Sequence, residues 1–315
     1  MVEKRTAEKF PGTFKLVPGV RLIEGETGGV ILRLSPLKAV RVNGAAFEIL
    51  KKCESGFSPE NVGSWASTNT PDPTLMFLDA MCSAQVLRWT PSRQTAQPLV
   101  SIIVPVYNRA EEVGECLESI LALNYPPERR EIIVVDDAST DTTTDVVRSY
   151  GNEIKLLLQE KNLGQSAARN AGISFAAGDI LAFIDSDCIA HRNWLYDLTA
   201  YFEDPRIALV GGIVGSYFRE SWLDRYEQAR SPLNMGNQMF ICTSFDSDFY
   251  VPTCNMLVRK SASLEAAGFD ESLRVGEDVD LCWKLKKLGH RLVYVPEGHV
   301  SHKHRNRFWP AFKRR

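Results

Sequence analysis

Short apolar runs and helical repeats make up the N-terminal part of the chain. Residues 30–34 and 39–42 are apolar runs of strand length, and residues 45–52 carry apolar side chains at helical spacing. Residues 72–87 form a second stretch with its apolar positions near one helical face. The pattern predicts a small module that contains a hairpin and two helices.

A polar stretch with two prolines follows this module at residues 90–98. Proline and polar residues between two periodic segments are typical of a linker. We therefore expect a domain boundary here, with one domain over residues 1–95 and a second over residues 96–315.

Beyond the boundary, continuous apolar runs alternate with amphipathic helices. The predicted strands are residues 99–106, 131–135, 155–158 and 180–184, and the helices between them include residues 111–123 and 164–176. This alternation predicts an α/β fold with a mainly parallel sheet and helices on both faces. Ligands of such sheets bind beyond the carboxyl ends of the strands, so the residues after each strand are the first candidates for a site.

Three of the predicted strands end in polar side chains that would meet at one edge of the sheet. The segments are Pro105-Val106-Tyr107-Asn108, Asp136-Asp137-Ala138-Ser139 and Asp185-Ser186-Asp187. For Asp136 and Asp137, capping of a helix is as good an interpretation as ligand binding. Asp185 and Asp187 are like charges two residues apart, which repel unless a cation or water separates them. Mn2+ or Mg2+, which bind carboxylate oxygens, would relieve this conflict.

The composition of the chain argues against some classes of protein, those that bind nucleic acid through their overall charge and those that span a membrane. The 315 residues carry 37 Lys and Arg against 39 Asp and Glu, a net charge of -2, so the molecule as a whole does not attract nucleic acid. No stretch approaches the roughly 18 to 20 consecutive apolar residues of a membrane span, so we expect no transmembrane segment. The 7 cysteines stand singly, without a C-x-x-C pair, which favours a reducing, cytoplasmic location.

Five motifs occur in the order typical of one enzyme family. They are Ser101-Ile102-Ile103-Val104-Pro105-Val106-Tyr107-Asn108, Val135-Asp136-Asp137-Ala138-Ser139-Thr140-Asp141, Asn162-Leu163-Gly164 with Ala168-Arg169-Asn170, Asp185-Ser186-Asp187, and Gly276-Glu277-Asp278. Through these motifs the chain resembles the family 2 glycosyltransferases of the GT-A fold, from about residue 98 to residue 305. The resemblance implies a Rossmann-like sheet, a nucleoside-diphosphate sugar donor, a hydroxyl acceptor and a divalent metal ion.

The resemblance also implies roles for the residues of the first two motifs. Tyr107 would stack on the donor base, and Asp137, with its neighbour Asp136, would accept hydrogen bonds from the base. Pro105 and Asn108 belong to the same donor-binding segment.

The remaining motifs imply contacts to the rest of the donor and to the metal. Arg169 would support the nucleotide, although a salt bridge on a helix face is the ordinary interpretation of such an arginine. Asp185 would hold the ribose. Asp187 would bind the metal, and His302 would close the metal site, since imidazole suits Mn2+.

A helix that begins at Gly276 is predicted to carry the catalytic base. The resemblance implies that Asp278 takes the proton of the attacking hydroxyl, with Glu277, Asp280 and Trp283 in supporting or acceptor positions. Acidic residues in a first helical turn also interact with the helix dipole, and this is the ordinary interpretation of Glu277, Asp278 and Asp280. One carboxylate base suits direct displacement with inversion, while the metal stabilises the leaving diphosphate.

Two other enzyme classes are disfavoured. Processive family members carry Gln-x-x-Arg-Trp after the catalytic aspartate, where this chain has Leu281-Cys282-Trp283-Lys284-Leu285. Sugar-nucleotide pyrophosphorylases carry a glycine-rich loop with an arginine after the first strand, where this chain has Val106-Tyr107-Asn108-Arg109-Ala110.

Several segments of the chain resemble one subgroup of the family more than the family as a whole. The segments are Tyr226-Glu227, Arg230-Ser231-Pro232-Leu233-Asn234-Met235-Gly236, Tyr250-Val251-Pro252, Asn255-Met256-Leu257-Val258-Arg259 and His302-Lys303-His304-Arg305, which resemble the mycofactocin-system glycosyltransferases. The likeness implies UDP-glucose as donor, a redox cofactor derived from a ribosomal peptide as acceptor, and residues 222–250 on the acceptor side. Those enzymes continue past the point where this chain ends, so either the chain is shortened or its acceptor region is smaller.

The N-terminal module resembles a PqqD-like peptide-recognition domain. The likeness lies in Arg33-Leu34-Ser35 and in Val40-Arg41-Val42-Asn43-Gly44-Ala45-Ala46-Phe47-Glu48-Ile49-Leu50. It implies a small winged-helix unit with a three-stranded sheet that receives a peptide as an added edge strand. A purely structural appendage is the alternative for the module. For the whole chain, the alternative to an enzyme is a non-catalytic peptide-binding scaffold that retains a nucleotide-sugar site.

Overall fold

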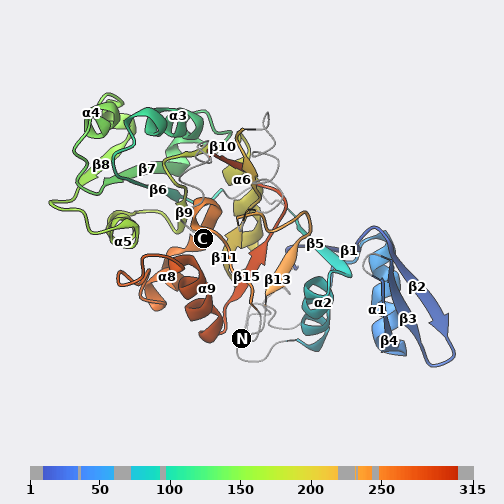
Figure 1. Ribbon diagram of the computed structural model, residues 1–315. Coiled ribbons are helices and arrows are strands. Elements are labelled where there is room, and N and C mark those ends of the chain that lie inside the picture. The colour runs from blue at the N-terminus through green and yellow to red at the C-terminus, as the bar shows by residue number, and fades with distance from the viewer. Residues whose placement is uncertain are drawn as a thin grey trace, which may run out of the picture.

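The computed structural model describes residues 10–34, 37–59, 72–92, 97–218, 231, 233–242 and 248–303. Within these ranges the strands form one large sheet, two small three-stranded sheets and a two-stranded ribbon (Figure 1). None of the helices in this part of the chain combines the length and the apolar character needed to cross a bilayer.

The large sheet has the predicted α/β architecture. Its strands are β6 (Val100–Val106), β7 (Arg130–Asp136), β8 (Lys155–Leu158), β9 (Ile180–Phe183), β11 (Ile207–Gly211), β13 (Phe240–Cys242), β14 (Met256–Arg259) and β15 (Arg291–Tyr294). Their order is β13-β15-β11-β14-β9-β6-β7-β8. Strands β6 to β9 run parallel, as do β11 and β15, whereas β13 and β14 run antiparallel to their neighbours. The prediction of a mainly parallel sheet is confirmed.

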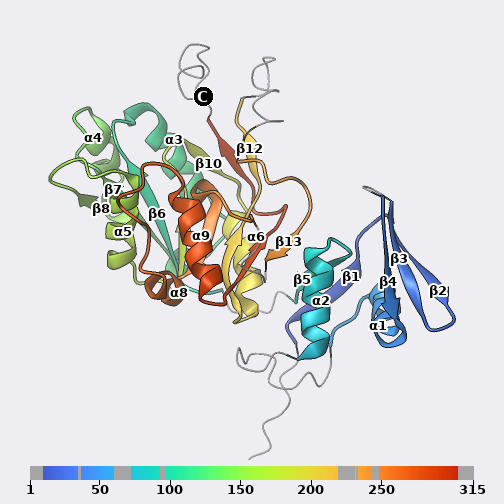
Figure 2. The same cartoon turned by 60° about the horizontal axis from the view of Figure 1, so that its bottom comes forward.

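Helices cover both faces of this sheet (Figure 2). They are α3 (Ala110–Leu121), α4 (Thr143–Arg148), α5 (Gln165–Phe175), α6 (Trp194–Thr199), α8 (Lys260–Glu265) and α9 (Glu277–Lys287), with short 3-10 turns η1 (Pro127–Arg129), η2 (Gly151–Glu153), η3 (Ala200–Glu203) and η4 (Thr253–Asn255). The predicted helices at residues 111–123 and 164–176 correspond to α3 and α5.

The side chains of β6 explain why both faces are covered. Successive residues of a strand point to opposite faces. Ile102 is buried in one cluster with Leu117 of α3, while Ile103 is buried in a second cluster with Leu281 of α9. Helix α5 lies so close to β6 that a Cβ at Gly172 would be 2.5 Å from the Ile103 side chain. Glycine therefore permits this close packing of helix on strand.

A small sheet stands at the carboxyl ends of the large one. Its strands are β10 (Cys188–Ala190), β12 (Val214–Ser216) and β16 (Val300–His302), in the order β10-β16-β12. The antiparallel register of β10 and β16 places Cys188 directly opposite His302. The backbone N–H of Lys303 also donates to the Asp187 carbonyl at 2.9 Å. This pairing brings the end of the chain's described part to the aspartates that follow β9.

The N-terminal residues form an antiparallel sheet that one helix covers. The elements are β2 (Val20–Gly25), β3 (Gly28–Leu34), β4 (Leu37–Asn43) and α1 (Gly44–Ser55). The Asn43 side chain caps α1 by accepting the N–H of Ala46 at 2.9 Å. Leu50 of α1 is buried in one cluster with Ile31 of β3. The predicted hairpin is the pair β3 and β4, and β2 extends it to three strands.

Helix α2 (Pro73–Ser83) lies between this unit and the large sheet (Figure 1). It is followed by β5 (Leu87–Pro91), which pairs with β1 (Gly12–Leu16). The predicted helix at residues 72–87 is therefore too long, because Gln85 adopts φ 58 and the chain then turns into β5. Helix α2 packs on β13, where the Ser83 hydroxyl donates to the Ile241 carbonyl and Asp79 forms an ion pair with Arg291. The domain boundary between residues 95 and 96 stays a prediction.

Candidate active site

A cavity lies where the carboxyl ends of β6, β7 and β9 meet, as the strand pattern predicts. Its volume is about 180 Å3, and its lining includes Pro105, Tyr107, Arg109, Asp137, Gln165, Asp185 and Asp187. Tyr107 stands at the rim with 44% of its surface exposed. A larger hollow of about 940 Å3, lined by Asp179, Tyr196 and Arg259 among others, lies at the opposite end of β9. The smaller cavity is the candidate site because the strand-end carboxylates converge there.

The two aspartates after β7 differ in their surroundings. Asp136 is buried, with one carboxylate oxygen accepting the N–H of Ser139 at 2.8 Å and the other accepting the Thr144 hydroxyl at 2.5 Å. Asp137 accepts the N–H groups of Leu163 and Gly164 at 2.7 and 2.8 Å. Both oxygens of Asp136 are thus used by its own loop and by the first turn of α4, although the N-cap residue of that helix is Thr142. Asp137 ties the loop before α5 to the cavity wall.

Asn108 also serves this loop structure. It adopts φ 50, a left-handed conformation that asparagine tolerates better than most residues. Its side-chain oxygen accepts the N–H of Thr140 at 2.8 Å, and its own N–H donates to the Ser139 hydroxyl at 3.0 Å. Asn108 therefore joins the loop after β6 to the loop after β7.

Arg169 is the most deeply buried charge of the site. Only 1% of it is exposed, and it donates to Asp185 at 2.8 Å and to Glu277 at 2.9 Å. Burial disfavours its charge, but the two carboxylates outweigh this effect and raise the pKa of Arg169. Gln165 donates to the same Glu277 oxygen at 2.6 Å. The arginine thus joins the end of β9 to the start of α9. The motifs in the sequence indicate neither its two partners nor Gln165.

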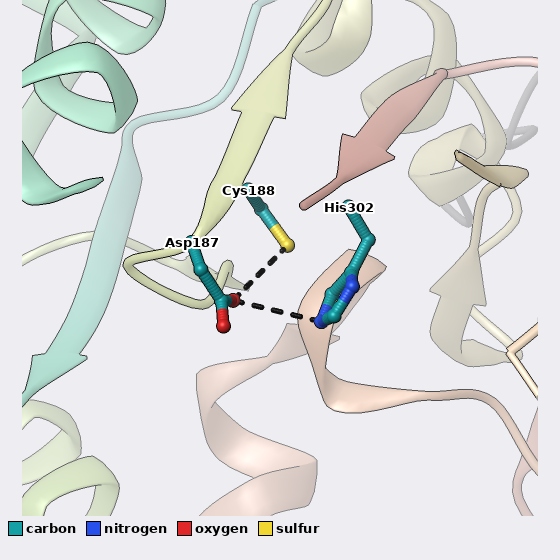
Figure 3. Close-up of side chains that lie close together, drawn as sticks. All are labelled: Asp187, Cys188 and His302. Atoms are coloured by element: carbon teal, nitrogen blue, oxygen red, sulfur yellow. Dashed lines mark hydrogen bonds and ion pairs between the residues drawn. The ribbon is translucent and has the colours of Figure 1, made fainter. Parts of the chain in front are cut away.

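Asp187 lies close to His302, as predicted, and also to Cys188 (Figure 3). Its carboxylate is 3.5 Å from Nε2 of His302 and 3.9 Å from Sγ of Cys188. Arg109 approaches the other oxygen at 3.9 Å. Burial raises the pKa of Asp187, and the nearby His302 opposes this shift. Cys188 and Arg109 were missed because their approach to Asp187 depends on the fold.

Asp278 lies in the first turn of α9, after Gly276, which adopts φ 84. Its carboxylate accepts the N–H of Val279 at 2.9 Å, and burial raises its pKa. Asp280 forms an ion pair with Lys284 one turn along the helix at 2.7 Å. Trp283 lies on the same helix with 46% of its surface exposed.

Some predicted residues cannot be placed. Residues 222–230, 232 and 243–247 of the expected acceptor segment lie outside the described residues. So do Tyr226, Glu227, Arg230, His304 and Arg305 from the subgroup motifs.

Comparison with known sequences decides the family. The protein family "Glycosyl transferase family 2" matches residues 101–265, which is more than half of the chain. The chain belongs to glycosyl transferase family 2. The matched residues include the strand-end motifs of the cavity, Arg169, and the pair Asp185 and Asp187.

A related member of family 2 covers nearly all of this chain. The pre-mycofactocin glycosyltransferase of Mycobacterium tuberculosis is 32% identical over 312 residues, which is 98% of this chain and 62% of that protein. The chain therefore spans less than two thirds of the length of this relative.

Solved structures confirm the GT-A-like fold of this family 2 chain. A mannosyltransferase from Pyrobaculum calidifontis, solved with GDP-Man and Mn2+, aligns with a TM-score of 0.54 at 24% identity, over 70% of this chain and 61% of that one. Residues 1–349 of S. aureus TarS, solved with UDP-GlcNAc, align with a TM-score of 0.54 at 24% identity, over 66% of this chain and 59% of that one. The likeness of the N-terminal module to a PqqD-like domain stays a prediction.

Proposed function

We propose that this chain is a metal-dependent, inverting glycosyltransferase that moves a sugar from a nucleoside-diphosphate donor to an acceptor hydroxyl. One observation carries the proposal. In a family 2 chain with a GT-A-like sheet, the buried Arg169 joins Asp185, one of the aspartates after β9, to Glu277, the residue next to the base candidate Asp278 on α9.

The donor would bind in the cavity at the strand ends. The exposed ring of Tyr107 is available for stacking on a base, and Asp137 on the cavity wall offers acceptor oxygens. Arg109 lines the same cavity beside Asp187, where a guanidinium suits a diphosphate. Asp185, held by Arg169, would contact the ribose. Complexes of related folds with GDP-Man and UDP-GlcNAc support a nucleotide-sugar donor.

The metal would bind to Asp187 and His302. Their oxygen and nitrogen lie 3.5 Å apart, and a carboxylate with an imidazole is a suitable donor set for Mn2+. When bound, Mn2+ or Mg2+ would stabilise the negative charge of the departing diphosphate. The Mn2+ in the mannosyltransferase complex supports a divalent ion, and the choice of ion belongs to the proposal.

Asp278 would act as the general base. The acceptor hydroxyl gives its proton to the carboxylate while its oxygen bonds to the anomeric carbon and the sugar–diphosphate bond breaks, which inverts that carbon. Burial of Asp278 raises its pKa and so makes it a stronger base than an exposed aspartate. Glu277 is held by Arg169 and Gln165, which suits a supporting position, and the exposed Trp283 is available to an acceptor.

The finer assignment is UDP-glucose as donor and a mycofactocin-type, peptide-derived acceptor. The 32% identity to the pre-mycofactocin glycosyltransferase supports it. A peptide acceptor also suits the N-terminal sheet, because β4 is exposed along nearly its whole length and carries Lys38 and Arg41 without an acidic residue. An extended acidic peptide could pair with this edge as an added strand.

The test follows UDP release from UDP-glucose in the presence of Mn2+, with EDTA added in a parallel reaction. Asp278→Asn should lower the rate by about 10^2- to 10^4-fold, the usual contribution of a general base, and Asp187→Ala should remove the response to Mn2+. Asp145→Asn, an exposed aspartate of α4 paired with Arg148, is the matched control and should retain the rate.

The scaffold alternative makes the opposite prediction. UDP-glucose would bind, an acidic peptide would bind to the N-terminal module, and no UDP would be released with any candidate acceptor. That result would exclude the enzymatic proposal.

A further inference from the structure

Three side chains with different ligand atoms converge at the start of β10 (Figure 3). They are Asp187, Cys188 and His302, and their nearest oxygen, sulfur and nitrogen atoms all lie within 4.8 Å of one another. The function proposed above uses two of these side chains and leaves the thiol without a role.

The strand register explains why the thiol is present at this point. Cys188 and His302 are directly opposed on antiparallel strands, and such pairs have Cβ atoms about 4.5 to 5.5 Å apart on the same face. Asp187 precedes Cys188 in the chain, and its carboxylate turns back toward both side chains. The convergence therefore follows from backbone pairing and does not depend on a chance rotamer of one residue.

The spacing suits a small tetrahedral ion. Ligand atoms about 2.0 to 2.3 Å from a zinc ion lie roughly 3.3 to 3.7 Å from one another. The separations here are 3.5 Å between Asp187 and His302 and 3.9 Å between Asp187 and Cys188. Small side-chain shifts would bring all three atoms into contact with one ion.

We propose that Cys188 is a third protein ligand of this metal site, and that the site binds a borderline-soft dication such as Zn2+ or Co2+ more tightly than Mg2+ or Mn2+. The inference rests on the metal-binding role proposed above for Asp187 and His302. Thiolate and imidazole favour Zn2+ and Co2+, whereas Mg2+ prefers a set made of oxygen atoms.

The charges and neighbours of the cluster are compatible with this binding. On binding, the Cys188 thiol releases its proton to the solvent, the thiolate forms the metal–sulfur bond, and one water leaves the ion. The carboxylate and the thiolate then neutralise the two positive charges. Burial and the neighbouring Cys254 side chain both raise the pKa of Cys188, and a bound dication would offset this by stabilising the thiolate.

The experiment titrates the purified full chain with Co2+ in the absence of nucleotide and records its absorption. A thiolate bound to Co2+ gives an intense ligand-to-metal charge-transfer band in the near ultraviolet, which carboxylate and imidazole ligands do not produce. We expect this band to grow to one equivalent of Co2+ and to disappear when Zn2+ is added. An equal concentration of Mg2+ should leave it in place.

Variants assign the band to one thiol. Cys188→Ala should abolish it and weaken Co2+ binding by at least about tenfold, because loss of a residue that only hydrogen-bonds to a metal ligand already costs about that much. Cys116→Ala is the matched control, because Cys116 is buried beside Asp185 but is not one of the three converging side chains, and it should retain the band. Thermal unfolding of each variant shows whether it is folded, and His302→Ala is a second variant that should also lose the band.

Binding of Co2+ without the band, a band that survives in folded Cys188→Ala, or displacement of Co2+ by Mg2+ as readily as by Zn2+ would each overturn the inference. Sugar transfer is measured separately. UDP release that needs Mn2+, together with an absent thiolate band, would overturn only the role of Cys188. A thiolate band without UDP release would count against the transferase and leave the Cys188 site standing.

Discussion

Two pairs of strand-end carboxylates, Asp136 with Asp137 and Asp185 with Asp187, look alike in the sequence and differ in the structure. Each pair follows a buried strand. The oxygens of the first pair accept hydrogen bonds from neighbouring loops, while Asp185 and Asp187 face Arg169, His302 and the cavity. A buried carboxylate whose oxygens are already occupied, such as Asp136, supports the loop around it, whereas Asp137 also lines the cavity. A carboxylate that faces basic side chains and the cavity, such as Asp187, is available to a ligand.

We expect the largest loss of stability when Arg169, which joins the end of β9 to the start of α9, is replaced. Arg169→Met leaves the buried Glu277 and the partly exposed Asp185 without their cation, and breaking a buried ion pair such as that of Arg169 and Glu277 typically costs about 3 to 5 kcal/mol. Urea unfolding measures the loss. Arg148→Met, which removes an exposed arginine of α4, should stay close to the parent protein. An Arg169→Met protein as stable as the parent would show that the two carboxylates do not depend on it.

A direct comparison of the two pairs should give an effect of intermediate size. Asp136→Asn replaces one acceptor oxygen by an NH2 group that faces a donor, and an unsatisfied buried group costs about 1 to 3 kcal/mol. Asp187→Asn should leave stability nearly unchanged while it removes the response to metal. Thermal unfolding of both variants, with metal binding measured alongside, tests this separation. The reverse order of stabilities would contradict the distinction between supporting and ligand-facing carboxylates.

The smallest effect concerns pH. Because burial raises the folded-state pKa of Asp278, ionisation of this group opposes folding. The penalty is absent below the pKa of the unfolded chain, grows as the pH rises toward the folded-state pKa, and is constant above it. Asp278→Asn should therefore match the parent in acid and be more stable at neutral pH.

The midpoint of thermal unfolding, measured across this pH range without nucleotide, tests the point. Asp145→Asn serves as the exposed control. A difference between Asp278→Asn and the parent that does not change with pH would mean that burial does not disfavour the Asp278 charge.

Much of the fold could be predicted because its signals are local. The strand at residues 99–106 is a continuous apolar run, and β6 occupies it with nearly every side chain buried. The helix at residues 72–87 was drawn too long because apolar residues continue past Ser83 into β5. Strand β2 was not predicted, since most of its residues are exposed and Arg21 and Glu24 interrupt its short apolar run.

The candidate site was predictable only as far as strand ends reveal it. The polar residues after β6, β7 and β9 could be assigned to one edge from alternation alone. The partners of Arg169 lie 16 and 108 residues away in the chain, and no spacing rule relates them. Cys188 reaches His302 through the register of β10 and β16, which depends on how the last strands return to the sheet.

The place of α2 has a consequence for how the protein can be divided. Strand β13 is the edge of the large sheet, and α2 packs against it while Ser83 binds the Ile241 carbonyl. An uncovered edge strand invites pairing with other copies and aggregation. A fragment that lacks α2 would expose this edge and would also leave Arg291 without Asp79. The helix α2 therefore protects an edge of the sheet that carries the site from pairing with other chains.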